Sequence, residues 1–265
     1  MLLTLLFVLS GSAATALTYL ACDCLTLWWL LPVWLGYYVA AVLLYILWLF
    51  SSLLLASDTA NPSRRLKSFY HWCEVHTLSW LLIQLGIRKE FRGEDKIPTD
   101  RPFLFVCNHL SAFDPITTVA LFKKAQMCFV CKPEVMKMPV LGTALRHAGF
   151  FPIDRENPRN AVTAIKHGAE VIKEQGRSIG IYPEGTRSKT GEMLPFHGGS
   201  FKIAKQAVCP VVVASIRYEK RKVLPGYKWV HLHVVDVMDT DYVKENNTAA
   251  MAERAQEAIK KDLSQ

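Results

Sequence analysis

The sequence predicts an α/β fold with a mainly parallel or mixed sheet flanked by helices, preceded by an N-terminal transmembrane helical hairpin. Three observations support this prediction. Between Met1 and Ser57 the only charged residue is Asp23. Beyond this segment, short and almost continuously apolar runs alternate with stretches of helical periodicity. Polar residues cluster directly after several of the apolar runs, as they do at the strand ends of open sheets that are buried on both faces.

The N-terminal segment is apolar enough to span a bilayer. No charge occurs from Leu25 to Ala56, and Trp and Tyr lie towards both ends of the run, which is typical of a spanning helix within 27–55. A weaker apolar segment, 1–22, precedes it and lacks the basic start of a signal peptide. We therefore predict a membrane anchor of two helices at 1–58. One spanning helix, with the first segment lying in the interface, remains an alternative.

Basic residues follow this anchor directly. Arg64, Arg65 and Lys67 place the rest of the chain on the cytoplasmic face by the positive-inside rule. We thus expect an integral membrane protein, in the inner membrane if the protein is bacterial, with a globular domain at 63–265. Its first part, 69–87, is apolar-rich but interrupted by polar side chains, which predicts a helix at the membrane interface.

Charge and cysteine content narrow the possible partners. The chain carries a formal net charge of +8, which favours anionic headgroups or phosphorylated substrates, and no nucleic-acid-binding signature is present. Cys128 and Cys131 have CxxC spacing but no second ligand pair, so we interpret them as reduced residues of a buried strand. His231 and His233 alternate along another strand, where we favour structural roles. We predict no metal site.

The alternation of elements in the globular part can be followed along the chain. Two helices have clear patterns. Asn157 and Pro158 mark the start and Gly176 the end of the first, and the second runs over 248–263 with apolar residues on one side. The apolar segments predicted as strands are 103–107, 127–131, 178–182, 210–216 and 229–237.

The stretch FVCNHLSAFDP, residues 105–115, stops an apolar strand on Asn108 and His109 and places Asp114 five residues beyond the histidine. Residues five apart on a helix do not share a face. The two side chains can therefore meet only if His109 lies in a loop and Asp114 opens the next helix, with Pro115 in its first turn. Two interpretations remain open: a general base with its orienting carboxylate, or loop residues followed by a helix cap.

Two further clusters follow other apolar runs. GFFPIDR ends in Asp154 and Arg155, and IGIYPEGTRS leads a strand into Glu184, Gly185 and Arg187. Glycine permits a tight turn, and arginine offers a planar fork that suits phosphate oxygens. Either cluster alone is also explained by a surface turn with a salt bridge. Together with a base-like histidine, they indicate transfer of a group to the hydroxyl of a phosphorylated acceptor.

These motifs resemble those of the glycerolipid acyltransferases, particularly the 1-acylglycerol-3-phosphate acyltransferases. NHLSAFD fits the NHxxxxD motif, FFPIDR is similar to the second block, and YPEGTRS fits the third, with Tyr182 where the family commonly has Phe. AVCPVVVASI resembles the fourth block, from which Cys209 and the run 211–213 depart. That departure weakens only the expected contribution of this strand to acyl-chain packing. The blocks come in the family's order over 103–216.

The resemblance implies an acyl thioester donor (acyl-CoA or acyl carrier protein), 1-acylglycerol 3-phosphate as the lysophospholipid acceptor, and membrane lipids as partners. His109 would be the general base on the sn-2 hydroxyl, Asp114 would orient it, and Asn108 would support the pair. The implied substrate-binding residues, with the arginines for phosphate, are Arg155, Glu184, Gly185, Thr186 and Arg187. The resemblance calls for no metal or organic cofactor.

Other functions remain open at this point. The acceptor could be another lysophospholipid, glycerol 3-phosphate or lyso-ornithine lipid. His109 could activate water in a thioesterase, and the chain could be a non-catalytic lipid-binding protein with a decayed site. A Cys107–His109 pair that forms an acyl-enzyme is a further alternative, although Cys107 ends an apolar strand and is expected to be buried.

Overall fold

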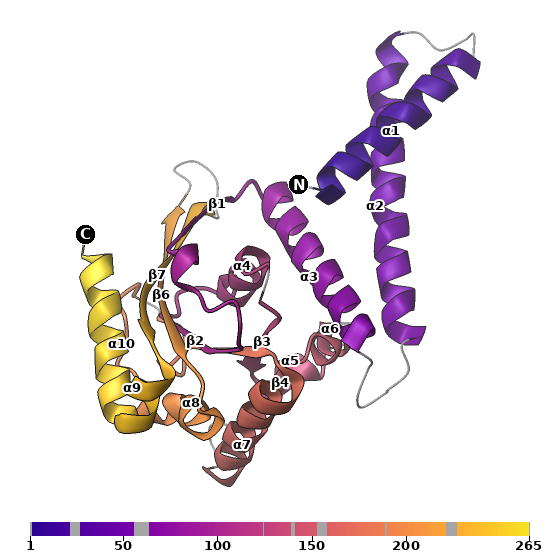
Figure 1. Ribbon diagram of the computed structural model, residues 1–265. Helices are drawn as coiled ribbons and strands as arrows, with labels where there is room; N and C mark the ends of the chain where they lie inside the picture. Colours follow the sequence, from indigo (N-terminus) through magenta and orange to yellow (C-terminus); the bar gives the residue numbers. More distant parts are fainter. Residues whose placement is uncertain are drawn as a thin grey trace. The chain divides into compact units, whose positions relative to one another are not determined.

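The computed structural model describes residues 2–21, 27–55, 64–123, 125–138, 141–152, 158–188, 190–220 and 227–264. The chain divides into two compact units, Met1–Lys67 and Ser68–Gln265, and Figure 1 labels the elements along the sequence. The predicted site residue Arg155 and the predicted helix cap Asn157 lie outside the described residues.

The first unit contains a pair of apolar helices. Trp34 Nε1 donates a hydrogen bond to Ser12 Oγ at 3.2 Å, and the hydroxyl oxygens of Thr18 and Tyr37 lie 2.7 Å apart. These contacts tie the helices together side by side, as a hairpin requires. The elements are α1 (Leu2–Ala21), a short 3-10 helix η1 (Leu27–Trp29) and α2 (Leu30–Leu55).

Within the described residues, one helix is long and apolar enough to cross a membrane, at Leu30–Trp48, with a mean hydropathy of 2.0. The apolar part of α1, Leu5–Leu20, is shorter. Two apolar helices are therefore present where the sequence predicts a hairpin. Whether one or both of them span a membrane stays a prediction.

The second unit is built on a mixed sheet, in which the described strands have the order β1-β7-β6-β2-β5-β3-β4. Neighbouring strands are parallel, except that β6 and β7 pair antiparallel. The fold class predicted from the sequence is thus confirmed. The strands are β1 (Arg88–Arg92), β2 (Leu104–Cys107), β3 (Met127–Cys131), β4 (Phe151–Pro152), β5 (Ser178–Ile181), β6 (Val211–Lys220) and β7 (Tyr227–Met238).

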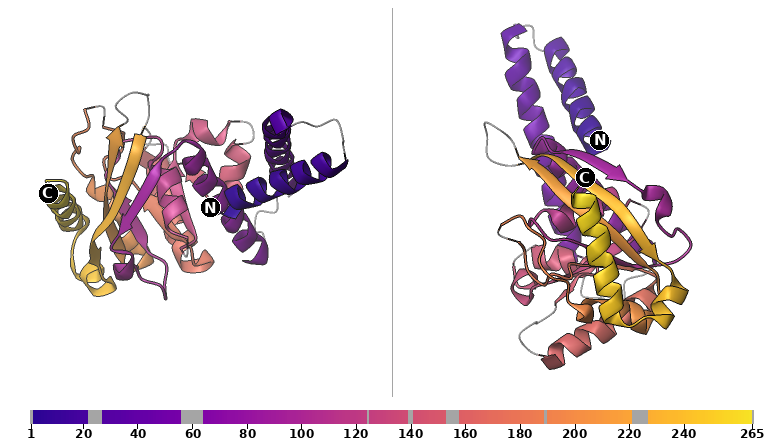
Figure 2. Two further views of the ribbon diagram at one scale, coloured as in Figure 1. Left: turned by 90° about the horizontal axis from the view of Figure 1, so that it is seen from above. Right: turned by 90° about the vertical axis from the view of Figure 1, so that its left-hand side faces the viewer.

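Helices cover both faces of this sheet. The long C-terminal helix α10 lies over β6 and β7 on one face, while α3 and α4 lie on the other (Figures 1 and 2). The central strands β2 and β5 are buried along their whole length, and every residue of β2 is apolar, as is typical of a strand covered on both faces. The helices are α3 (Arg64–Gln84), α4 (Asp114–Leu121), α5 (Pro133–Met136), α6 (Leu141–His147), α7 (Pro158–Gln175), α8 (Lys202–Ala207), α9 (Thr240–Glu245) and α10 (Thr248–Leu263), with 3-10 helices η2 (Glu94–Lys96) and η3 (Gly198–Phe201).

Two elements near the start of this unit, a helix and a strand, differ from the sequence prediction. The helix expected at 69–87 begins at Arg64, so the basic residues expected before it form its first turn, and it ends at Gln84. Strand β1 was not predicted because its sequence, RKEFR, lacks an apolar run. Among the described strands it is an edge strand paired with β7 alone, and edge strands tolerate charged side chains because one side faces solvent.

Strand β6 is longer than predicted and has consequences for the site. It was expected to end at Ile216 but continues to Lys220. Its neighbour β2 ends at Cys107, which pairs with Ala214. The last residues of β6 therefore run beside the loop that follows β2, rather than beside a strand.

Candidate active site

His109 and Asp114 form a close pair at the carboxyl end of β2. His109 Nδ1 lies 2.7 Å from Asp114 Oδ2, and the Asp114 side chain is completely buried. The same oxygen accepts the backbone N–H groups of Leu110 and Ser111 at 2.8 and 2.9 Å. The loop thus folds back on the first residue of α4, which brings together two residues that are five positions apart.

The helix-cap interpretation of Asp114 is wrong. Asp114 is itself the first residue of α4, and the residue before it, Phe113, makes no side-chain cap. The Asp114 carboxylate accepts N–H groups from the loop preceding the helix, instead of those in the first turn of the helix. The acid therefore orders the His109 loop.

Asn108 extends the sheet beyond the end of β2. Its side-chain Nδ2 donates to the Ile216 carbonyl at 2.9 Å, and its Oδ1 accepts the Ile216 N–H at 2.8 Å. A primary amide can satisfy both backbone groups because it carries a donor and an acceptor. This pair of bonds fixes the loop to β6 immediately before His109.

Glu184 joins the loops after β2 and β5. Its Oε1 accepts the His109 N–H at 2.6 Å, and its Oε2 accepts the Leu194 N–H at 3.0 Å. Burial raises the pKa of Glu184, and the two backbone N–H groups oppose that shift. Both oxygens hold the backbone, and among the described residues no ion pair joins Glu184 to Arg187.

The turn after β5 carries the remaining predicted residues. Gly185 has a φ of +75°, which favours glycine, and its N–H donates to the Tyr182 carbonyl. Ser188 N–H donates to the His109 carbonyl at 2.9 Å, so this turn lies against the histidine loop. Thr186 and Arg187 are exposed on it. The structure thus brings all described predicted residues to one edge of the sheet.

Two tyrosines complete the surroundings of the pair. The Tyr182 ring stacks on the His109 imidazole, with centroids 4.1 Å apart and an interplanar angle of 12°. The Tyr218 hydroxyl donates to Asp114 Oδ1 at 2.6 Å. The sequence offered a signal for Tyr182, which directly precedes the Pro-Glu-Gly turn. It offered none for Tyr218, which is distant in sequence and has no motif around it.

Cys107 is not placed to act as a nucleophile. The side chain is fully buried, and burial, together with the negative charges of Asp114 and Glu184, raises the pKa of its thiol well above the usual value. Thiolate is the reactive form of cysteine, so this environment suppresses nucleophilic attack. The Cys107–His109 alternative loses its support.

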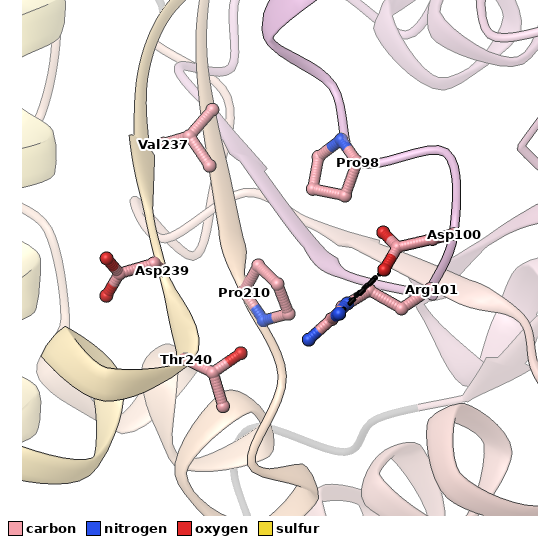
Figure 3. Close-up of a pocket in the computed structure, with 7 residues that line it drawn as sticks. All are labelled: Pro98, Asp100, Arg101, Pro210, Val237, Asp239 and Thr240. Atoms are coloured by element: carbon pink, nitrogen blue, oxygen red, sulfur yellow. Dashed lines mark hydrogen bonds and ion pairs between the residues drawn. The ribbon is translucent and has the colours of Figure 1, made fainter.

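A concavity lies at the opposite edge of the sheet, where β2 and β6 begin and β7 ends (Figure 3). Its volume is about 220 Å³. The Arg101 guanidinium at its rim is paired with the Asp100 carboxylate at 2.6 Å, and both side chains are exposed. The residues lining it are Pro98, Asp100, Arg101, Pro210, Val237, Asp239 and Thr240.

The two strand histidines are held by carboxylates from other elements. His231 contacts Glu90 at 2.5 Å and Glu219 at 3.2 Å, and His233 contacts Asp262 at 2.6 Å. These contacts link β1, β6, β7 and α10. Within the part of the chain that the structure describes, no group of three or more His, Cys, Asp or Glu could hold a metal ion.

The chain is similar in sequence to curated acyltransferases. The chain is 36% identical over 126 residues to a chloroplastic 1-acyl-sn-glycerol-3-phosphate acyltransferase of Brassica napus, covering 47% of this chain and 36% of that protein. It is 28% identical over 181 residues to the 1-acyl-sn-glycerol-3-phosphate acyltransferase alpha of Bos taurus, covering 66% of this chain and 62% of that protein. The matches thus span between about a third and two thirds of these relatives.

A solved structure has the same fold. The crystal structure of the 1-acyl-sn-glycerophosphate acyltransferase PlsC from Thermotoga maritima matches with a TM-score of 0.63 and 22% identity, covering 86% of this chain and 91% of that one. The model of the family described as Acyltransferase matches residues 88–217, which include β1, the His109–Asp114 pair, the Glu184 turn and most of β6. Over these residues the chain is therefore similar to the Acyltransferase family.

Proposed function

We propose that the protein transfers an acyl group from a thioester to the sn-2 hydroxyl of 1-acylglycerol 3-phosphate, giving phosphatidic acid. The observation that carries the proposal is the contact of His109 Nδ1 with the buried Asp114 carboxylate at 2.7 Å. His109 Nε2 has no hydrogen-bond partner among the described residues, and the side chain is 17% exposed. The names of the relatives support the choice of acceptor.

The pair suits general-base catalysis. With Nδ1–H donating to Asp114, Nε2 is the unprotonated nitrogen and accepts the proton of the acceptor hydroxyl. The hydroxyl oxygen attacks the thioester carbonyl, a C–O bond forms, and the C–S bond then breaks. The proton passes from Nε2 to the departing thiolate, which returns the histidine to its starting form. A positioned base of this kind accelerates a reaction by about 10²–10⁴.

Arginine side chains are proposed to hold the acceptor phosphate. Arg187 is exposed on the turn that contacts the His109 loop through Ser188 N–H. Its guanidinium can form a bidentate pair with phosphate oxygens. Arg155 is proposed for the same role because of its place in the FFPIDR block. Gly185 and Thr186 would form the wall of the acceptor site.

The remaining parts of the proposal concern donor and location. The donor is acyl-CoA or acyl carrier protein, and the reaction as proposed needs no metal or organic cofactor. Helix α2 would anchor the protein in the membrane that supplies the acceptor and receives the product. The basic residues Arg64, Arg65 and Lys67 favour the cytoplasmic face for the acyltransferase domain.

An acceptor panel tests this function. The full chain in detergent micelles would be given radiolabelled oleoyl-CoA with 1-oleoylglycerol 3-phosphate, glycerol 3-phosphate, lysophosphatidylcholine, lyso-ornithine lipid or monooleoylglycerol. We expect kcat/KM to be highest for 1-oleoylglycerol 3-phosphate. An equal rate with monooleoylglycerol would contradict the phosphate site, and free oleate released at the same rate with and without acceptor would indicate a thioesterase.

A further inference from the structure

Strand β6 reaches the catalytic loop by running past the end of β2. Cys107, the last residue of β2, pairs with Ala214, and β6 continues to Lys220. Ile216 holds Asn108 through both backbone groups. Side chains two residues apart on a strand point to the same face, so Tyr218 lies on the side of the buried Ile216 and meets Asp114.

Asp114 has an uneven set of hydrogen bonds. Its Oδ2 accepts three N–H groups, all from the loop residues His109, Leu110 and Ser111. Its Oδ1 accepts the Tyr218 hydroxyl at 2.6 Å and has no other partner among the described residues. Three bonds to one oxygen do not fix the plane of the carboxylate, since the terminal torsion of aspartate is broad. The bond from β6 supplies that second point of attachment.

We propose that Tyr218 is a positioning residue for the acyl transfer: its hydroxyl fixes the plane of the Asp114 carboxylate and thereby the orientation of the His109 base. The inference rests on the proposed function of that pair. Tyr218 does not touch the reacting atoms; it acts through Asp114. The hydrogen bond is charge-assisted, and bonds of this kind are about twice as strong as neutral ones.

The chemistry of the tyrosine fits this role. Burial, followed by the negative charge of Asp114, raises the pKa of the Tyr218 phenol above its usual value. The hydroxyl therefore keeps its proton and remains a donor throughout the neutral range. The titratable groups that surround Asp114 and Tyr218 among the described residues are His109, Cys107, Tyr182 and Glu184.

Tyr218→Phe removes the hydroxyl and keeps the ring. We expect kcat to fall by about ten-fold, the loss that corresponds to one charge-assisted bond, while KM for acceptor and donor stays within about two-fold. Without the Tyr218 hydroxyl, the negative charge of Asp114 is less well stabilised. The His109–Asp114 pair therefore binds a proton more tightly. The acidic limb of the pH dependence of kcat/KM should therefore move to higher pH.

The matched control is Tyr242→Phe, which removes a hydroxyl on α9, next to the pocket at the opposite edge of the sheet. It should leave kcat and the pH profile unchanged. Both variants would be compared with the parent protein by thermal unfolding and in the assay above, on whichever acceptor the parent protein prefers. If the parent protein prefers another acceptor, the proposed function is overturned. The comparison of Tyr218→Phe with Tyr242→Phe can then still be made on that acceptor. An unshifted acidic limb in Tyr218→Phe, or a kcat equal to that of Tyr242→Phe, overturns the positioning role.

Discussion

The edge of the sheet at the carboxyl ends of β2 and β6 is built differently from the edge at the amino ends of the same two strands. At the carboxyl end of β2, Asp114 and Glu184 are buried. Asp114 accepts backbone N–H groups with one oxygen, and Glu184 accepts them with both. At the amino end, Asp100 and Arg101 form an exposed pair beside an open pocket. Exposed ion pairs contribute little, whereas buried carboxylates persist only when their hydrogen bonds are satisfied.

The comparison shows that a cavity by itself does not identify the site. The concavity in Figure 3 has a definite volume but offers a neutralised cation and no buried polar group aimed into it among its lining residues. The opposite edge holds a histidine whose ring contacts Asp114 and Tyr182, and whose backbone is held by hydrogen bonds with Glu184 and Ser188. Organised polar side chains, more than open volume, distinguish a catalytic edge.

The largest expected effect comes from His109→Ala. We expect acyl transfer to fall by about 10²–10⁴, because the base is lost. Cys107→Ala is the matched variant two residues away and should retain most of the activity, since its thiol is buried with a raised pKa. Transfer of labelled oleate to 1-oleoylglycerol 3-phosphate measures both. Loss of activity in the cysteine variant alone would contradict direct attack.

Glu184→Gln should lower both stability and rate. A glutamine side chain has one acceptor oxygen, so its amino group must face either the His109 or the Leu194 N–H. An unsatisfied buried donor costs about 1–3 kcal/mol of unfolding free energy. Urea unfolding and kcat measure the two effects. Asp100→Asn, at the exposed pair, should change neither; equal losses in the two variants would erase the contrast between the edges.

Arg187→Ala should affect acceptor binding more than the chemical step. If Arg187 holds the phosphate, its removal raises KM for 1-oleoylglycerol 3-phosphate by about ten-fold, with a smaller change in kcat. Arg101→Ala removes a guanidinium from the other edge and should leave KM unchanged. A steady-state series over acceptor concentration distinguishes them, and an unchanged KM in Arg187→Ala would remove this residue from the phosphate site.

The smallest expected effect is that of Tyr182→Phe. The Tyr182 hydroxyl is buried, and Thr118 is a weak polar neighbour that gives it no hydrogen bond of normal geometry among the described residues, while its ring stacks on His109. Phenylalanine keeps the stacking and removes the unsatisfied group, so we expect stability to rise by up to about 1 kcal/mol and activity to stay within about two-fold. Thermal unfolding measures the gain. A clear loss of stability would mean that the hydroxyl has a partner in solution.

Much of the site could be predicted because its residues follow strands directly. Asn108 and His109 come straight after β2, and Glu184, Gly185 and Arg187 come shortly after β5. Parallel neighbouring strands bring such residues to one edge whatever the details of the loops. The role of Glu184 could not be predicted, because it depends on the N–H groups of His109 and Leu194, which no local pattern places beside it.

By itself, the sequence determined the alternation of buried strands and helices and the apolar N-terminal helices, and it made a pairing of His109 with a carboxylate five residues away possible. These follow from periodicity, hydropathy and the reach of a short loop. The tertiary structure alone decided that Asp114 orders the histidine loop instead of capping α4, and that Tyr218 completes its hydrogen bonds. The physical reason is that β6 extends past β2: the length of one strand relative to its neighbour is set by packing between distant segments.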